Sequence, residues 1–355
     1  MPPQTVHYEI DFIPVGTGER SGDAIALRVW GTKPQQVFVI DGGNKDSGKA
    51  LVQHIRDYYG TNVVNAVIST HPDSDHSSGL TEVLENMEVK QLVMHQPWDY
   101  APDIKSLFEN RGLTNLGLQR KIREELECAH ALKKIADRKN IPIVEPFEGS
   151  MWTDGLFVVL GPSQEYYKSL LPHFRPMPET KGEVGLIPTL IRKVEEGVEM
   201  LAEALDFETL ADGNEHFSAE NNTSTILLFI LGQDKVLFTG DADADALTLA
   251  ADYAEKNGLP LSNLKIMQVP HHGSKQNVGP TILNRIKAPS AHISVSPGAA
   301  PKHPSKKVIN ALIRRGSQVF TCTLGQTVCY HSDGVPIRAG WVNLPSHPFY
   351  PQVEA

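Results

Sequence analysis

A short segment rich in histidine and aspartate, 69–80 (STHPDSDHSSGL), constrains the possible folds of this chain more than any other feature. It places four potential metal ligands within six positions: His71, Asp73, Asp75 and His76. The preceding residues 63–69 are rich in Val and Ile, which predicts a buried β-strand. Side chains two residues apart lie on one side of an extended chain, and imidazole and carboxylate groups are ligands of zinc and manganese. The segment therefore predicts a divalent-metal site at the end of a buried strand, rather than a solvated polar loop.

Two later apolar segments also end in potential ligands. Residues 236–241 (VLFTGD) end in Asp241, and residues 266–274 (IMQVPHHGS) contain His271 and His272. Alone, Asp241 could be the N-cap of a following helix, and adjacent histidines are weak evidence for a metal site. In α/β proteins, however, the carboxyl ends of neighbouring strands form a common rim where sites are built. The three strand ends together therefore predict one shared site.

Strand and helix patterns alternate in two halves, 8–95 and 224–331, which predicts an α/β fold. A helix-rich stretch from about 98 to 215 separates the halves, and we interpret it as an insertion within a single domain of residues 1–355. Inside this stretch we expect helices at 121–139 and 190–210, two strands within 141–160, and a loop at 171–188. The Gly-rich turn at 15–22 precedes a strand rather than a helix, so it does not match the dinucleotide-binding fingerprint.

Composition indicates the class of protein. The 355 residues are 40% hydrophobic and 21% charged, as in a soluble globular protein with a sizeable core. No apolar run approaches the roughly 20 residues of a membrane-spanning helix, and the first residues, MPPQ, lack the basic region of a secretory signal. Three cysteines do not make a disulfide framework, so we expect free thiols and a cytoplasmic location.

Charge is unevenly distributed along the chain. The formal net charge of -9 argues against a general nucleic-acid binder, but the last 100 residues contain 11 Lys or Arg and only two acids. Such asymmetry suggests an anionic partner for the C-terminal part. The basic residues around His303 are predicted to bind nucleic acid: Lys302, Lys306, Lys307, Arg314 and Arg315. A solvated basic helix is the alternative interpretation.

The motifs HxDxDH, TGD and PHHGS follow one another in the order of the metallo-β-lactamase superfamily, which this chain resembles. Within it, the chain is most similar to the hydrolase domain of the ComEC/Rec2 competence proteins and their stand-alone soluble relatives. Residues 15–25 resemble the opening motif of that branch, split by an insertion, and Asp41 in IDGG matches its usual strand end. Asn221 in NNTS and His303 in HPS resemble two further motifs. The resemblance does not cover the stretch from about 98 to 215.

This resemblance implies a metallo-β-lactamase-like αββα sandwich with two divalent metal ions, zinc or manganese, at the sheet edges. The implied ligands of the first ion are His71 and Asp73, those of the second are Asp75, His76 and His272, and Asp241 bridges the two.

The chain departs from the usual superfamily pattern at the first ion. Asp73 stands where the commoner motif has a histidine, and the third histidine is missing, with Asn221 or Glu220 near its place. This oxygen-rich donor set favours manganese as much as zinc. At the second ion, His272 is preferred to its neighbour because the related ligand precedes a small residue, so His271 would face the substrate.

Two metal ions about 3.5–4 Å apart can activate a water and hold the attacking and leaving oxygens of a phosphodiester. Asp75 would orient the nucleophile, and His271 or His303 would contact a phosphate oxygen or protonate the leaving group. We therefore expect a hydrolase, either a phosphodiesterase or a nuclease, that acts on DNA or another nucleic acid. The alternatives are a hydrolase of a small phosphodiester, such as a nucleotide signal or a phosphocholine-like compound, and a regulatory protein with a weakened metal site. Four other histidines are expected to be ordinary surface or core residues: His95, His130, His173 and His216.

Overall fold

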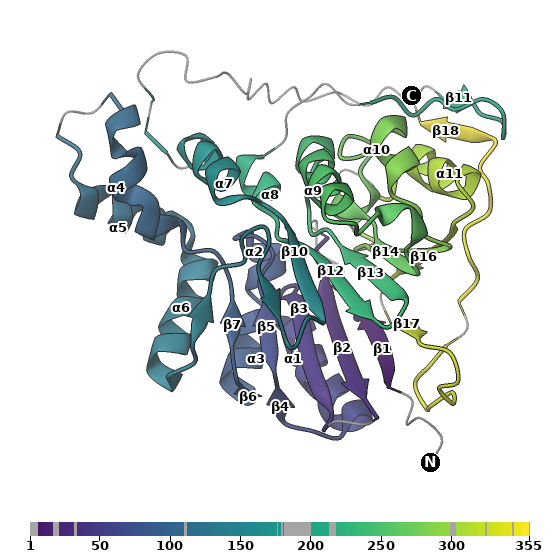
Figure 1. The fold of residues 1–355 in the computed structure, drawn as a ribbon, viewed down its shortest axis with the longest axis horizontal. Coiled ribbons are helices and arrows are strands. Elements are labelled where there is room, and N and C mark those ends of the chain that lie inside the picture. The colour runs from purple at the N-terminus through teal and green to yellow at the C-terminus, as the bar shows by residue number, and fades with distance from the viewer. Residues whose placement is uncertain are drawn as a thin grey trace.

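Two seven-stranded β-sheets form the centre of the computed structural model (Figure 1). The structure describes residues 6–16, 21–31, 34–109, 112–175, 177–178, 180, 200–212, 218–298, 303–323, 325–342 and 344–354. In order across the first sheet, the strands are β17 (Val328–His331), β1 (His7–Phe12), β2 (Ala24–Trp30), β3 (Gln36–Gly42), β5 (Ala66–Ile68), β7 (Leu92–Val93) and β8 (Ile143–Val144). Across the second sheet they are β16 (Gln318–Cys322), β15 (Ser290–Ser294), β14 (Ile266–Gln268), β13 (Asp234–Phe238), β12 (Ile226–Leu231), β10 (Phe157–Gly161) and β9 (Met151–Trp152).

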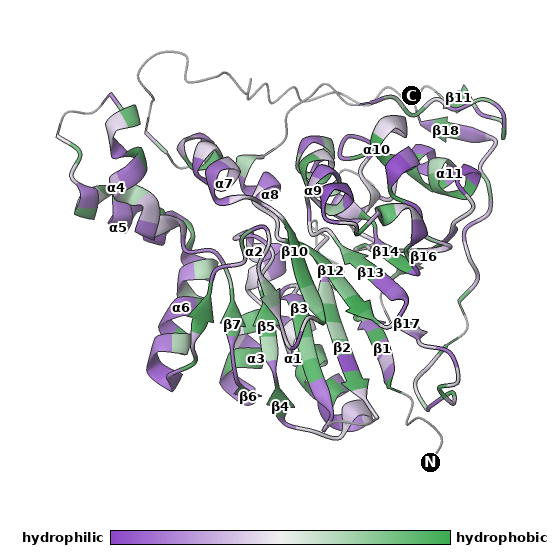
Figure 2. Cartoon of the chain, viewed as in Figure 1, coloured by the Kyte–Doolittle hydropathy of each residue, from purple (hydrophilic) through white to green (hydrophobic). Residues whose placement is uncertain are grey.

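Apolar side chains from both sheets form one buried cluster between them. On β3, Phe38 and Ile40 point into this cluster, and Phe157 of β10 meets Phe38 edge-on with ring centroids 4.9 Å apart. The alternate β3 residues, Val37 and Val39, belong instead to a cluster on the outer face of the first sheet. Both faces of these strands are buried, which explains why the strands read as nearly continuous apolar runs in the sequence (Figure 2).

Helices cover the outer face of each sheet. Outside the first sheet, the apolar cluster includes residues of α1 (Lys45–His54), α3 (Leu80–Asn86), α5 (Asn115–Glu125), α6 (Glu127–Lys139) and α7 (Gln164–Leu170). Outside the second, it includes residues of α9 (Ala244–Lys256), α10 (Pro280–Arg285) and α11 (Lys306–Arg314). The predicted αββα sandwich is therefore confirmed.

Several short elements complete the chain. They are the π-helix Ile55–Tyr59, the helices α2 (Ser74–Ser77), α4 (Ala101–Ile104) and α8 (Ala219–Asn222), and the 3-10 helices Pro97–Tyr100, Lys105–Leu107, Leu171–His173, Leu261–Asn263 and Pro270–Gly273. Two small sheets pair β4 (Val63–Val64) with β6 (Glu88–Val89), and β11 (Met200–Ala202) with β18 (Gln352–Glu354).

Local sequence determines where two key helices begin. The side chain of Asn44 accepts a hydrogen bond from the backbone N–H of Ser47 and caps α1. Asp243 accepts from the N–H groups of Asp245 and Ala246 and caps α9. Asp241 is therefore not the cap of that helix and remains available for the site.

The stretch from about 98 to 215 contributes strands to both sheets as well as helices. Its strands β8 and β10 belong to the first and second sheets, so only some of its segments lie outside the sandwich. The helix expected at 121–139 is present but broken at Leu126 into α5 and α6. The prediction of a helix at 190–210 is wrong for residues 200–202, which form β11 and pair with the C-terminal β18. Most of the loop expected at 171–188 lies outside the described residues, and Leu171–His173 is a 3-10 turn.

The three cysteines are free, as expected: Cys128, Cys322 and Cys329. Cys322 lies in the second sheet and Cys329 in the first, so they do not face each other across a hairpin. Among the described residues, no helix has the length and apolar character needed to span a membrane.

Candidate metal centre

The carboxyl ends of two parallel strand pairs, one from each sheet, form the rim that the sequence predicts. β3 ends at Asp41 and Gly42, and its parallel neighbour β5 leads into the loop that carries His71. In the second sheet, β13 leads to Asp241 and its parallel neighbour β14 leads to His272. The site therefore lies where the two sheets meet.

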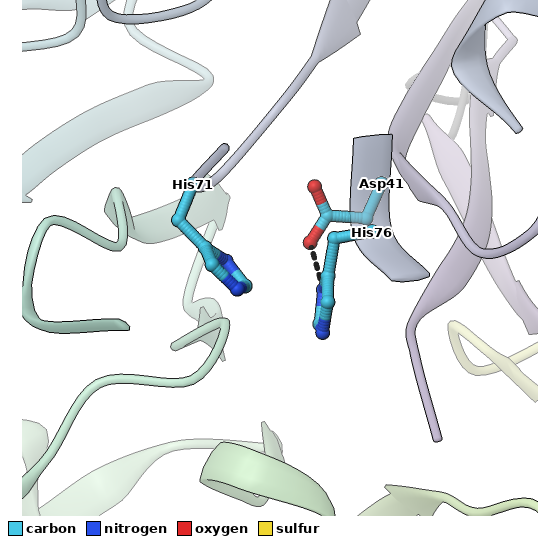
Figure 3. A group of neighbouring side chains, drawn as sticks. All are labelled: Asp41, His71 and His76. Atoms are coloured by element: carbon cyan, nitrogen blue, oxygen red, sulfur yellow. Dashed lines mark hydrogen bonds and ion pairs between the residues drawn. The ribbon is translucent and has the colours of Figure 1, made fainter. Parts of the chain in front are cut away.

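The orientation of His71 and His76 is set by Asp41 and Thr70. His76 donates from Nδ1 to Asp41 Oδ2 at 2.8 Å, and the Thr70 hydroxyl donates to the same oxygen at 2.6 Å. Because that hydroxyl proton is committed to Asp41, Thr70 Oγ1 accepts from His71 Nδ1 at 2.9 Å. Figure 3 shows Asp41 bound to the near nitrogen of His76, while the other ring nitrogen points away from the carboxylate. In its neutral form, each ring therefore presents an Nε2 lone pair to the site.

His272 is oriented in the same way from the second sheet. Its Nδ1 donates to the carbonyl oxygen of Ser294 at 3.0 Å, which leaves Nε2 as the acceptor atom. The backbones of His271 and His272 have φ of 45° and 56°, a left-handed conformation that is rare outside glycine. At Gly273, where φ is 79°, a Cβ would lie 2.7 Å from Pro304 Cβ, so only glycine fits behind the histidine pair.

Three histidines surround the Asp241 carboxylate. Its oxygens lie 3.8 Å from His71 Nε2, 3.4 Å from His76 Nε2 and 3.6 Å from His272 Nε2. These Nε2 atoms and Asp241 Oδ1 are buried and have no hydrogen-bond partner among the described residues.

Buried polar atoms without partners are costly, and an ion coordinated by them would remove that cost. His76, Asp241 and His272 form a group whose ligand atoms lie within 4.8 Å of one another. Two imidazoles and a carboxylate are a common donor set for a divalent ion with an open coordination position. Asp41, His71 and His76 form a second such group, but hydrogen bonds already occupy both Asp41 oxygens.

The pKa values reflect the strong coupling of these groups. Burial opposes ionisation of Asp241, but His76 and His272 hold the pKa of that carboxyl well below its usual value. Burial likewise lowers the pKa of His76, but Asp241 and Asp41 outweigh burial and raise it well above its usual value. Burial lowers the pKa of His272 to about 3, and burial together with His76 lowers the pKa of His71. The carboxylates thus favour a positive charge at their centre, which a metal ion would supply in exchange for a proton.

Two of the aspartates predicted as ligands lie outside both groups. Neither group found among the described residues includes Asp73 or Asp75. The Asp73 carboxylate binds the Arg175 guanidinium, with Nη2 at 2.8 and 2.7 Å from its two oxygens. Asp75 Oδ1 is buried without a hydrogen-bond partner in the described part of the chain.

The residues predicted to contact the substrate lie together beside Asp241. His271 Nε2 is 3.9 Å from Asp241 Oδ2, and the ring of His303 lies 5.9 Å from that of His271. Asn221 donates from Nδ2 to His271 Nδ1 at 3.4 Å. Burial and the neighbouring His271 lower the pKa of His303 to about 4, so this ring is neutral at pH 7.

The basic residues predicted to bind nucleic acid make contacts within the protein where the structure describes them. Arg314 binds Glu203 and Arg315 binds Glu208, and their side chains are only 9% and 10% exposed. Lys307 is buried, and Lys306 lies over the ring of Tyr350 at 5.2 Å from its centroid. These long side chains satisfy carboxylates and cover apolar surface instead of facing solvent as a group. Lys302 lies outside the described residues.

A pocket of about 430 Å³ adjoins the loop between His71 and His76. Its lining comprises Pro72, Asp73, Ser74, Glu125, Leu126, Glu127, Cys128, Arg175 and Glu220. Four of these residues are acidic and only Arg175 is basic, so the pocket has an excess of negative charge. The helices α5 and α6 supply part of the wall, so part of the stretch between the two halves lies beside the loop that joins His71 to His76.

Sequence reasoning missed two residues that shape this site. Asp41 was assigned only to a strand-end motif, although its hydrogen bond orients His76. Arg175 gave no signal, because it lies in a Pro-rich segment without periodicity, and only its contacts reveal its position.

The other histidines behave as expected where the structure describes them. His95 is buried and stacks on Tyr167 with ring centroids 4.3 Å apart, and His130 packs against Trp98. His173 ends a 3-10 turn. His216 and residues 17–20 of the Gly-rich turn lie outside the described residues.

Comparison with known proteins identifies the family. The sequence profile of the metallo-beta-lactamase superfamily matches residues 17–295. The chain is 25% identical over 140 residues to ComE operon protein 3 of Bacillus subtilis, and 31% identical over 138 residues to Recombination protein 2 of Haemophilus influenzae. These matches cover 39% and 38% of this chain, and the chain spans only 17% of the length of each relative.

A solved structure with similar topology is the metallo-beta-lactamase fold protein YhfI from Bacillus subtilis, at 10% identity and a TM-score of 0.44. That match covers 91% of this chain and 100% of YhfI. The profile match extends over most of the chain and includes the loop of His71 and His76, Asp241 and His272. The chain belongs to the metallo-beta-lactamase superfamily.

Proposed function

We propose that this chain is a metal-dependent hydrolase of phosphodiesters. The proposal rests on one observation: three oriented histidines and Asp241 converge at the rim of the two sheets, with buried ligand atoms that have no hydrogen-bond partner in the described part of the chain. His76, His272 and Asp241 would hold a divalent ion, with His71 beside them. Such an ion would supply Lewis-acid stabilisation of a phosphoryl oxygen and increase the acidity of a nearby water.

The remaining polar residues would position the substrate. His271 has 26% of its side chain exposed and lies beside Asp241, so it can donate a hydrogen bond to a phosphoryl or leaving oxygen. Asn221 bonds the opposite nitrogen of the His271 ring and would hold that ring in place. His303 is neutral at pH 7 and would contribute a hydrogen bond rather than a positive charge.

The pocket favours a small phosphodiester over a polynucleotide. Its volume of about 430 Å³ suits a small molecule, and its four carboxylates would repel a run of phosphates. The basic residues that would have compensated, Arg314 and Arg315, are committed to ion pairs. A substrate whose leaving group is neutral or cationic, such as a phosphocholine-like compound, matches this lining best.

Nucleic acid is the second candidate substrate. It is favoured by the similarity of part of the chain to Recombination protein 2, whose name indicates a role in recombination. A nuclease would have to bring its scissile phosphate to the same histidines.

Hydrolysis by the purified, manganese-loaded chain tests the proposal. We expect turnover of bis(p-nitrophenyl) phosphate and of p-nitrophenyl phosphorylcholine, and little degradation of plasmid, single-stranded DNA or RNA. His272→Ala should reduce turnover by at least about 100-fold, since second-sphere changes alone cost 10–100-fold. His331→Ala is the matched control, because its ring stacks on Trp341 at the edge strand β17.

Three outcomes would contradict hydrolysis of a small phosphodiester at this site. Equal turnover by His272→Ala and the parent would show that the histidine cluster is not the active site. Rapid degradation of DNA with no turnover of the small diesters would make the chain a nuclease. Absence of hydrolysis of every substrate, despite bound metal, would support the regulatory alternative.

A further inference from the structure

Arg175 connects two carboxylates beside the histidine cluster. Its Nη2 lies 2.8 and 2.7 Å from the two oxygens of Asp73, and its Nε lies 3.2 Å from Glu220 Oε1. The backbone N–H of Arg175 donates to the same Glu220 oxygen at 2.7 Å. The arginine is thus fixed through its main chain as well as its side chain, which a chance surface ion pair would not require.

The two carboxylates are the ones on which a first metal ion would depend. Asp73 is the ligand that the superfamily motif implies beside His71, and Glu220 is one of two residues near the missing third histidine. Glu220 is 1% exposed, and its second oxygen accepts from the Ser218 hydroxyl at 2.7 Å. Both oxygens of each carboxylate therefore already have partners.

We propose that the Arg175 guanidinium replaces the first metal ion, so that this chain binds one divalent ion where two are usual. A guanidinium remains charged at all accessible pH values and would repel a divalent ion held by the same carboxylates. The remaining ion would be bound by His76, His272 and Asp241, none of which contacts Arg175 in the described structure. The inference rests on the proposed metal-dependent function, but not on the identity of the substrate.

The position of Arg175 also gives it a role toward the substrate. Its side chain is 55% exposed and lines the pocket that adjoins the loop between His71 and His76. Guanidinium groups present planar N–H donors that match phosphoryl oxygens, and preorganised positive charge stabilises the charge that develops during phosphoryl transfer. Arg175 would thus provide the cationic contact that the first ion provides elsewhere, in a pocket that is otherwise acidic.

Metal stoichiometry tests the inference without any substrate. The full chain would be stripped with EDTA, dialysed against excess MnCl2, desalted and measured by elemental analysis, with calorimetric titration of MnCl2 in parallel. We expect one Mn²⁺ for each parent chain and two for Arg175→Ala. The double variant Arg175→Ala with Asp73→Asn should return to one ion, because the second ion would need Asp73.

Two further variants control for folding and for general loss of charge. Asp73→Asn alone should still bind one ion with parental affinity, since Asp73 does not bind the retained ion, and Arg175→Gln should behave as Arg175→Ala does. Arg285→Ala, which breaks the ion pairs of Arg285 with Asp252 and Glu255 of α9, should bind one ion. Two ions in the parent, or one ion in both well-folded Arg175 variants, would overturn the inference and leave the proposed function intact. No metal in the parent would overturn both.

Discussion

Replacement of Asp41 by asparagine is the sharpest test of how this site is built. Asp41 Oδ1 accepts from the Thr70 backbone N–H at 2.8 Å, and Oδ2 accepts from the Thr70 hydroxyl and from His76 Nδ1. Asparagine has almost the same shape and also tolerates the left-handed backbone of this position, where φ is 53°. The substitution therefore changes the hydrogen-bonding of one atom and leaves the backbone unstrained.

The consequence for metal binding follows from the tautomer of His76. If the amide nitrogen of asparagine takes the place of Oδ2, its N–H groups face two other donors, the His76 Nδ1–H and the Thr70 hydroxyl. His76 relieves this conflict by moving its proton to Nε2, the atom that must bind the ion. If the amide turns round instead, its nitrogen faces the backbone N–H of Thr70, so one donor–donor conflict remains in either orientation. Loss of such a second-sphere partner weakens metal binding about 10–100-fold, which corresponds to about 1.4–2.8 kcal/mol at about 1.4 kcal/mol per tenfold change in affinity.

Competition with a chelator of known affinity would measure the dissociation constant for Mn²⁺ in both proteins. Asp46→Asn is the matched control, because Asp46 is exposed on α1 and pairs with Lys49 on the surface. Far-UV circular dichroism would verify that both variants keep the fold. A dissociation constant for Asp41→Asn within twofold of the parent value, in a folded protein, would refute the orienting role of Asp41.

Three further predictions concern stability. The pKa of buried His95 is lowered to about 3, so its neutral form stabilises the fold fully above the unfolded pKa of about 6.5 and loses that contribution as pH falls. Urea unfolding at pH 7 and at pH 5 should show that His95→Phe loses about 2 kcal/mol less stability on acidification than the parent chain does. An unchanged pH dependence would contradict this prediction. Arg314→Met should cost about 3 kcal/mol, because it removes the cation that pairs with the buried Glu203 carboxylate. Adding Glu203→Gln should recover most of the loss, and an effect on DNA binding but not on unfolding would contradict the prediction. Mn²⁺ at about 100 times its dissociation constant should stabilise the parent chain by about 2.7 kcal/mol, and the same scan of His272→Ala should show little change.

The metal cluster could be predicted because each ligand follows a buried strand in the sequence. Apolar runs before His71, Asp241 and His272 located three strand ends, and parallel pairing brings such ends to one rim. The αββα arrangement followed from the same alternation of strands and helices. The local pattern could not indicate which groups each side chain contacts. Asp73 stays a predicted ligand, and in the structure its carboxylate binds Arg175.

Long-range ion pairs explain most of the remaining errors. Net charge in the C-terminal part suggested a basic surface, but Glu203 lies 111 residues from Arg314 in the sequence and neutralises it in the structure. The helix expected at 190–210 failed for a similar reason, because the C-terminal β18 provides the pairing partner of β11. Periodicity and composition describe neighbours along the chain and cannot identify partners that tertiary structure supplies.

The glycine of the TGD motif shows why the site requires both halves of the chain. Thr70, at the end of the first sheet, accepts from the backbone N–H of Thr225 in the second half at 2.9 Å, so the two sheets are joined directly beneath the ligands. At Gly240, where φ is 53°, a Cβ would lie 2.9 Å from both Thr70 Oγ1 and Ser224 Oγ. Any side chain there would push Asp241 away from the histidines of the first sheet, because those two hydroxyls hold His71 and the Asp241 backbone. The histidine cluster is therefore fixed by the junction of the sheets. Arg175 comes from the stretch between the two halves and binds the neighbouring Asp73 and Glu220, so that stretch can alter the charge beside the metal centre without contacting its ligands.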